Sequence, residues 1–134
     1  MITATRYHDI SCGHRVVGHE NKCALLHGHN YRIHFTCTAE SLDTVGRVLD
    51  FSVIKSKLCM WLEDNWDHKF LAWYEDEVIR SIYRMVEPSI VWVPFNPTAE
   101  NMADHLLRVI GPAQLEGTWV TLTEVVVEET RKCS

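Results

Sequence analysis

The segment CALLHGHNYRIHFTCTA, residues 23–39, combines the pattern of a β-strand with a pair of closely spaced histidines. From His29 to Ala39 apolar residues alternate with polar ones, as in a strand that buries one face. His27 and His29 lie two residues apart, so a strand that begins here would direct both imidazoles to one face. We therefore expect this strand to carry part of a metal site as well as part of a sheet.

Three further segments favour strands around this one. Residues 2–12 are rich in β-branched and aromatic types, and a first strand here would lie antiparallel to the histidine-bearing strand. Residues 118–130 are dense in valine and threonine and predict the last strand. Residues 89–95 are also β-rich, but Pro94 favours an edge position.

Helical periodicity covers the middle of the chain and a segment near its end. One apolar stripe runs through residues 51–65 and a second through residues 74–86. A third helix is predicted over residues 98–110, with Thr98 as its cap and Gly111-Pro112 as its end. The order strand, strand, helices, strand predicts an α+β fold in which an antiparallel four-stranded sheet has helices on one face. The uncovered edges of such a sheet favour oligomerisation.

Composition narrows the class of protein. The chain has 134 residues, 46% of them hydrophobic and 23% charged, which predicts one globular domain over residues 1–134. A net charge of −5 argues against a nucleic-acid partner, and no apolar run is long enough to span a membrane. Five irregularly spaced cysteines and no visible signal peptide predict a cytoplasmic protein with reduced thiols.

A third histidine completes a candidate metal site. His14 follows the first predicted strand and would face the start of the second, beside His27 and His29. Three histidines can bind zinc and leave a fourth position open, which is typical of catalytic sites. Hydrogen-bonded histidines at strand ends are the alternative. Cys23 could be a fourth ligand, a buried inert thiol or a base with a lowered pKa, and the residues leave these possibilities open.

Two carboxylates, Asp67 and Glu129, are also candidate functional residues. Asp67 precedes His68 in a break between helical patterns, and a carboxylate that orients an imidazole forms an acid/base unit. Adjacent residues do not usually hydrogen-bond each other, so we expect a more distant partner for either group, or a solvated pair. Glu129 ends an apolar strand and could accept two N–H bonds from an aminopyrimidine edge, unless water alone surrounds it.

Taken together, these residues resemble the 6-pyruvoyl-tetrahydropterin synthase / 6-carboxy-5,6,7,8-tetrahydropterin synthase family. The resemblance implies the tunnelling fold, an antiparallel sheet with two main helices on one face that assembles into an oligomeric barrel. It also implies a hexamer, a dimer of trimers, with active sites between subunits. The motifs that carry it are Gly13-His14-Arg15, Cys23-x3-His27-Gly28-His29-Asn30-Tyr31, Asp50-Phe51, Asp67-His68-Lys69, Pro97-Thr98-Ala99-Glu100-Asn101 and Glu129-Thr130.

The resemblance also implies roles for single residues. Zinc would be the cofactor and Cys23 the catalytic thiolate, while a neighbouring subunit would donate the acid/base pair. Cations would hold a triphosphate. The implied zinc ligands are His14, His27 and His29; the acid/base pair Asp67 and His68; the pterin anchor Glu129; further pocket residues Thr98, Glu100 and Thr130; and the cations Arg15, Lys22 and Lys69.

The spacing between cysteine and histidines favours one branch of the family. Three residues separate Cys23 from His27, as in the 6-carboxy branch, whereas 6-pyruvoyl enzymes tend to have a longer gap. The implied reaction converts 7,8-dihydroneopterin triphosphate to 6-carboxy-5,6,7,8-tetrahydropterin in queuosine-type 7-deazaguanine biosynthesis. A 6-pyruvoyl synthase and a non-catalytic zinc- or pterin-binding module are the alternatives. The residues after Lys69, Phe70-Leu71-Ala72, replace a Leu-Asn pair of many relatives and predict a different loop.

Overall fold

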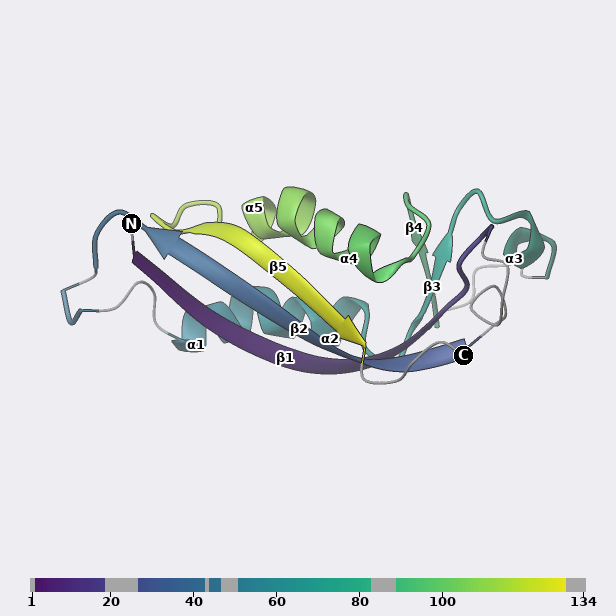
Figure 1. Ribbon diagram of the computed structural model, residues 1–134, viewed down its shortest axis with the longest axis horizontal. Coiled ribbons are helices and arrows are strands. Elements are labelled where there is room, and N and C mark those ends of the chain that lie inside the picture. The colour runs from purple at the N-terminus through teal and green to yellow at the C-terminus, as the bar shows by residue number, and fades with distance from the viewer. Residues whose placement is uncertain (1, 19–26, 43, 47–50, 83–88, 130–134) are drawn as a thin grey trace.

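A five-stranded mixed sheet forms the body of the protein (Figure 1). The computed structural model describes residues 2–18, 27–42, 44–46, 51–82 and 89–129. The strand order is β4-β3-β1-β2-β5. The strands are β1 (Ile2–His14), β2 (His27–Ala39), β3 (Phe70–Trp73), β4 (Ile90–Val93) and β5 (Thr121–Glu129).

The predicted pairing of the first two long strands is confirmed. β1 and β2 are antiparallel over their whole length, from Ile2 opposite Ala39 to His14 opposite His27. β5 continues the sheet antiparallel to β2, and a bulge between Thr36 and Cys37 shifts its register. The alternation of β2 is explained by burial, because its apolar side chains line the core on one face.

The prediction of four antiparallel strands is wrong in one respect. β3 was expected to be a loop, but Phe70–Trp73 forms a strand parallel to both β1 and β4. Four residues without polar alternation give too short a pattern to reveal a strand, and it forms because β1 and β4 offer hydrogen-bonding partners on both sides. β4 lies at the edge of the sheet, as predicted.

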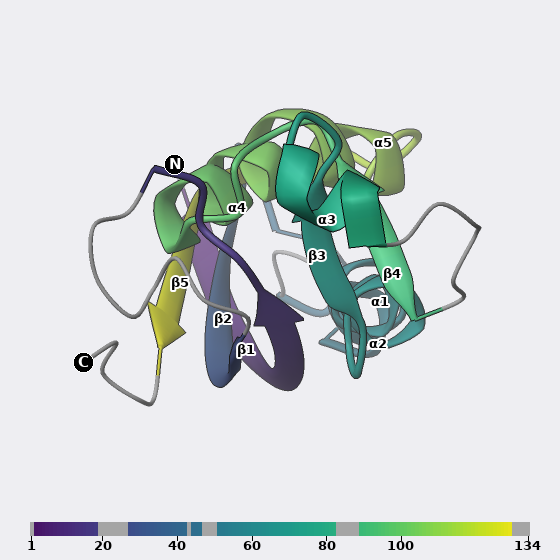
Figure 2. The same cartoon turned by 90° about the vertical axis from the view of Figure 1, so that its right-hand side faces the viewer.

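Two long helical segments pack on the same face of the sheet (Figure 2). The first runs through α1 (Phe51–Ile54), a π-helical turn (Lys55–Cys59) and α2 (Met60–Asn65), as predicted. The second runs through α4 (Ala99–His105), a π-helical turn (Leu106–Ile110) and α5 (Gly111–Gln114). Their core residues meet apolar side chains of β2 in one cluster, which includes Ile33, Phe35, Leu58, Leu62, Met102 and Leu106.

The predicted end of the second long helix at Gly111-Pro112 is also wrong, since helical structure continues to Gln114. Gly111 is needed there for close packing, because an added Cβ would collide with the Leu122 side chain. Pro112 lies in the first turn of α5, directly after the π-helical turn.

A short helix, α3 (Glu77–Ile82), falls within the helix predicted over residues 74–86, whose last residues lie outside the described ones. Asp76 caps this helix by accepting hydrogen bonds from the N–H groups of Val78 and Ile79. Among the described residues, no helix has the length and apolar character that a membrane span requires.

Candidate functional site

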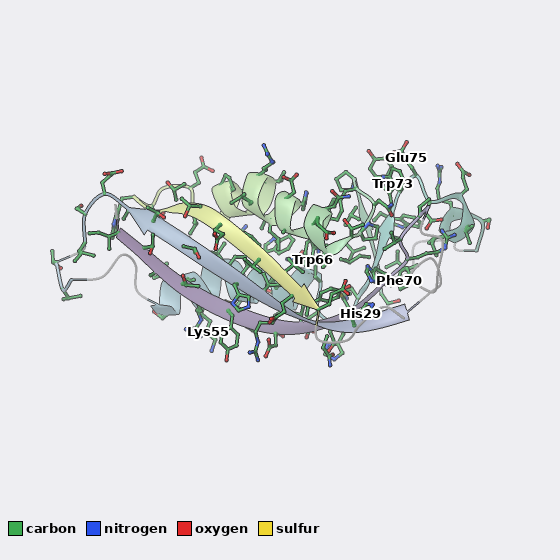
Figure 3. All side chains as sticks on the ribbon, viewed as in Figure 1. His29, Lys55, Trp66, Phe70, Trp73 and Glu75 are labelled. Carbon is green, nitrogen blue, oxygen red and sulfur yellow. The ribbon has the colours of Figure 1, made fainter. Side chains whose placement is uncertain are left out.

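Three side chains that could bind a metal meet where the ends of three strands come together. His14 ends β1, His29 lies near the start of β2, and Glu129 ends β5. Their ligand atoms all lie within 4.8 Å of one another, and both histidines are buried. His29 lies beside the end of β5 (Figure 3). The strand ends therefore form a possible metal-binding group of two imidazoles and one carboxylate.

Hydrogen bonds fix the orientation of His14. Its Nδ1 lies 2.5 Å from the carbonyl oxygen of Pro97, and because a carbonyl only accepts, Nδ1 carries the proton. Nε2, which lies 2.9 Å from the Tyr31 hydroxyl, then presents its lone pair. Metal-binding histidines typically donate their other N–H to a carbonyl or carboxylate, so this arrangement fits a ligand.

The loop that carries Pro97 is itself fixed to the chain that follows His14. Asn96 accepts the N–H of Val17 at its Oδ1 and donates from Nδ2 to the Val17 carbonyl, each at 2.8 Å. The Asn96 carbonyl accepts from Thr98 N–H and from the Asn101 side chain. This double hydrogen bond ties the 96–98 loop to the segment that follows β1 and so holds the carbonyl that orients His14.

The buried groups beside the metal-binding group stay neutral. Burial, together with the negative charges that Cys12 and Glu129 would carry, raises the pKa of the Tyr31 hydroxyl far above its usual range. Burial raises the pKa of the Cys12 thiol to about 12, with a smaller contribution from the charges of Asp67 and Glu129. Cys12 is therefore an inert thiol at neutral pH.

Asp67 and His68 form a hydrogen-bonded pair. Nδ1 of His68 lies 2.8 Å from Oδ2 of Asp67, so the expectation that adjacent residues would not bond each other is wrong. The pair forms because His68 adopts a left-handed conformation with φ +59°, which turns its side chain back. Burial opposes ionisation of Asp67, but hydrogen bonds from Ser11 N–H and His68 outweigh it and lower the pKa of its carboxyl.

The Asp67–His68 pair binds the same edge of β1 as β3 does, just before the first residue of β3. Asp67 Oδ1 accepts the N–H of Ser11 at 2.8 Å, and the N–H of His68 donates to the Ser11 carbonyl at 2.6 Å. The next contact along the same edge joins Gly13 N–H to the Lys69 carbonyl. His68 itself is 82% exposed and borders an open hollow of about 490 Å³ that Ser11, Gly28, Lys69 and Ser89 also line.

Some predicted site residues lie outside the described ones. Cys23, Lys22 and Thr130 belong to this group. The backbone of His27 pairs with that of His14, as the sequence predicted. The structure thus brings together His14, His29 and Glu129, and separately Asp67 and His68.

The remaining predicted residues have clear local roles. Thr98 caps α4 by accepting the N–H of Asn101, and Glu100 is exposed in its first turn. Arg15 donates from Nη1 to both carboxylate oxygens of Asp76, each at 2.7 Å. Because Asp76 is buried, this ion pair fastens α3 to the segment after His14 and commits Arg15 to a structural contact.

Sequence reasoning missed the residues that orient the site. Tyr31 was predicted only as an apolar strand position, Asp76 as part of the helix over residues 74–86, and Asn96 as part of the turn that starts the next helix. Their partners lie 17, 61 and 79 positions away in the sequence, so no local pattern could reveal them. The Asn96-Pro97-Thr98 turn next to a cap was the one available signal.

A known protein family matches almost the whole chain. A model of the family described as 6-pyruvoyl tetrahydropterin synthase matches residues 3–134. The chain belongs to this family of enzymes.

Relatives with assigned names agree with the family match. A Rickettsia typhi protein named 6-carboxy-5,6,7,8-tetrahydropterin synthase is 37% identical over 134 residues, which cover 99% of this chain and 97% of the relative. A Halobacterium salinarum protein, named as a probable synthase of the same kind, is 33% identical over 122 residues, 90% of this chain and 76% of that protein.

Two solved structures share the fold. An uncharacterised protein from Wolinella succinogenes superposes with a TM-score of 0.82 at 22% identity, covering 98% of this chain and 94% of that one. The 6-pyruvoyl tetrahydropterin synthase of Caenorhabditis elegans superposes with a TM-score of 0.67 at 23% identity, covering 96% and 89%. At these identities the similarity establishes the tunnelling-type fold alone.

Proposed function

We propose that this chain is a 6-carboxy-5,6,7,8-tetrahydropterin synthase. It would convert 7,8-dihydroneopterin triphosphate to 6-carboxy-5,6,7,8-tetrahydropterin with release of acetaldehyde and triphosphate, in queuosine-type 7-deazaguanine biosynthesis. The names of relatives at 35–37% identity over almost the whole chain support this reaction. The structural observation that carries the proposal is that one strand, β1, contributes His14 to a possible metal-binding group and holds the Asp67–His68 pair through the N–H of Ser11.

The donor set fits zinc. Imidazole nitrogens and a carboxylate oxygen are usual zinc ligands, and the Pro97 carbonyl holds His14 with Nε2 available. In this proposal His14, His27 and His29 hold the ion. Zinc, when bound, would increase the acidity of the hydroxyls on the substrate side chain.

Glu129 would then bind the pterin ring instead of the metal. Its carboxylate lies next to both histidines, so an aminopyrimidine edge held there would place the rest of the substrate beside the ion. Thr98, Glu100 and Thr130 are the further candidates for this pocket. Tyr31 pairs with Glu129 across the sheet, and its hydroxyl stays neutral because its pKa is raised far above the usual range.

Proton transfer is assigned to Cys23 on one side of the substrate and to Asp67 and His68 on the other. The Asp67 carboxylate fixes the His68 tautomer with the proton on Nδ1, which leaves Nε2 to exchange a proton with substrate. His68 is largely exposed at a sheet edge while the metal-binding histidines are buried. This difference supports a homo-oligomer, such as a dimer of trimers, in which His68 serves the site of a neighbouring subunit.

Among the residues that the structure describes, a predicted cation for the triphosphate borders the hollow. Lys69 lines the hollow beside His68, whereas Arg15 is bound to Asp76. Lys69 is therefore preferred to Arg15, while Lys22 lies outside the described residues. We assign the reaction to the cytoplasm, where a nucleotide-derived triphosphate would be available.

Product analysis tests the proposal. The purified protein is incubated with 7,8-dihydroneopterin triphosphate, and the products are identified by mass spectrometry together with an assay for acetaldehyde. Acetaldehyde and the 6-carboxy product are expected. A 6-pyruvoyl product without acetaldehyde would assign the chain to the other branch of the family. Turnover equal to that of Cys23→Ala would leave only a binding function.

A further inference from the structure

A buried ion pair lies directly beyond the last residue of β1. Arg15 donates from Nη1 to both carboxylate oxygens of Asp76, each at 2.7 Å, and the two side chains are 18% and 1% exposed. Exposed ion pairs contribute little to a fold, whereas a buried pair depends on both partners, because removal of one leaves a buried charge without its counterion. This ion pair is therefore a fixed contact of the fold.

The Arg15–Asp76 pair continues a short contact between two strands. β1 and β3 pair in parallel at two positions, and the second of these joins His14 to Leu71. Arg15 is the next residue after β1, and Asp76 follows the end of β3 by three residues. The ion pair thus holds the two chain segments together just past the position of His14.

Asp76 is itself held firmly. Its Oδ1 accepts the N–H groups of Val78 and Ile79 in the first turn of α3, and its own N–H donates to the Trp73 carbonyl over 2.9 Å. Trp73 ends β3, and α3 lies at the end of that strand (Figure 2). Asp76 therefore gives Arg15 a rigid point of attachment.

A second contact holds the same segment from another part of the chain. Asn96 forms two hydrogen bonds of 2.8 Å with the backbone of Val17, and the Pro97 carbonyl next to it accepts from Nδ1 of His14. The segment after His14 is thus attached to α3 through Arg15 and to the 96–98 loop through Val17. A metal ligand binds well only when the parts around it hold it within about 0.5 Å of the required position.

We propose that Arg15 and Asp76 are positioning residues that hold the end of β1 so that His14 can bind the metal. Arg15 acts through Asp76 and the backbone, and does not contact the triphosphate. The inference rests on the proposed function only in taking His14 as a metal ligand.

Substitutions on both sides of the ion pair test this inference. Arg15→Met removes one charge at similar length, and Asp76→Asn removes the other but keeps an oxygen that can cap α3. We expect each to weaken zinc binding by roughly tenfold, as for other residues that orient metal-binding histidines. The double variant should lose no more than the worse single variant, because all three lack the same contact. Arg15→Lys, which keeps one charged nitrogen, should recover part of the affinity. Competition with a chelator measures these affinities.

An exposed ion pair supplies the matched control. Arg108 donates from Nε to Oδ1 of Asp104 over 2.6 Å in the second long helical segment, and the two side chains are 74% and 58% exposed. Arg108→Met and Asp104→Asn make the same chemical changes away from the metal-binding group. Both variants should bind zinc as the parent does.

Nitrogen-15 NMR of the metal-stripped protein separates this inference from the proposed reaction. The Nδ1 signal of His14 should move in Arg15→Met and in Asp76→Asn and stay at the parent value in the two controls. This holds whether or not the parent turns over the pterin. Failure of the parent to bind zinc would contradict the proposed function, and the His14 signal would still decide this inference.

Two results would overturn the proposal. Lower stability in urea, with zinc affinity and the His14 signal both at the parent values, would make the ion pair merely structural. A rise in KM for the triphosphate substrate in Arg15→Met alone, with Asp76→Asn like the parent, would make Arg15 a substrate contact. If a single variant does not fold, the double variant, which buries no unpaired charge, must show the change in zinc affinity and in the His14 signal.

Discussion

His68 donates a hydrogen bond from Nδ1 to Oδ2 of the residue directly before it, Asp67, over 2.8 Å, from a left-handed backbone conformation. A histidine in this conformation costs about 1 kcal/mol because its Cβ approaches the following carbonyl oxygen. The turn that makes the Asp67–His68 hydrogen bond possible thus lowers the stability of the fold, and the hydrogen bonds of Asp67 offset this loss.

Substitution of His68 should show this strain directly. We expect His68→Gly to be more stable than His68→Ala by about 1 kcal/mol, because glycine adopts a φ of +59° without the steric cost. Urea unfolding followed by circular dichroism measures the difference. Both variants should lose turnover, so equal stability of the two would contradict the strain and not the role of the imidazole.

Asp67→Asn should make the protein less stable at neutral pH than at low pH, relative to the parent. The hydrogen bonds of Asp67 lower the pKa of its carboxyl below the ordinary 3.8, so its contribution to stability is present above that value and is lost as the pH falls through the folded-state pKa. A loss of about 1 kcal/mol is expected at pH 7, shrinking below about pH 4. Urea unfolding at several pH values measures it, and a loss independent of pH would contradict this account.

Glu129→Gln should separate pterin binding from metal binding. The proposed function assigns the carboxylate to the pterin ring, although it lies within 4.8 Å of the ligand atoms of His14 and His29. We expect metal content to stay at the parent value while KM for the pterin rises by roughly tenfold or more. Elemental analysis and steady-state kinetics measure the two effects. A loss of metal with the substitution would instead make Glu129 a ligand.

Asn96→Ala should weaken metal binding from a distance. It removes both hydrogen bonds to Val17 and so loosens the loop whose Pro97 carbonyl orients His14. A loss of about tenfold in zinc affinity is expected, as for other residues that orient metal-binding histidines. Titration against a chelator measures it. Asn65→Ala, which removes one exposed helix hydrogen bond, is the control and should leave the affinity unchanged.

The buried thiols should resist alkylation. Burial raises the pKa of Cys12 to about 12 and that of Cys37 to about 11, so at pH 8 both stay protonated and inaccessible. Iodoacetamide at pH 8 should modify Cys23, the thiolate of the proposed function, before Cys12 or Cys37, with loss of turnover. Peptide mass spectrometry over time gives the order, and early modification of Cys12 would contradict it.

Local patterns predicted the parts of the fold that repeat along the chain. β2 alternates and the two long helices carry apolar stripes because each buries one face, and burial on one face produces a periodic pattern in the sequence. β3 was missed because four apolar residues carry no periodicity. The helical structure after Gly111 was missed because Gly111 was interpreted as a helix end, whereas in the fold it makes room for the Leu122 side chain.

The candidate site was predicted residue by residue but not contact by contact. The histidines and Glu129 could be named from their positions at predicted strand ends. The Asp67–His68 bond could not, since it depends on one backbone angle, and neither could the Asn96–Val17 clamp, which joins distant segments. Motifs record which groups are present, whereas the fold decides which of them touch.

The Asp67–His68 pair and the metal-binding group are both attached to β1, and this sets how far apart they are. Ser11 binds the Asp67–His68 pair through its backbone, and His14 belongs to the metal-binding group. Ser11 and His14 are three positions apart, which amounts to roughly 10 Å along the strand at the usual rise per residue. The covalent geometry of β1 thus fixes the distance along the strand between the residue that holds the Asp67–His68 pair and the residue that joins the metal-binding group.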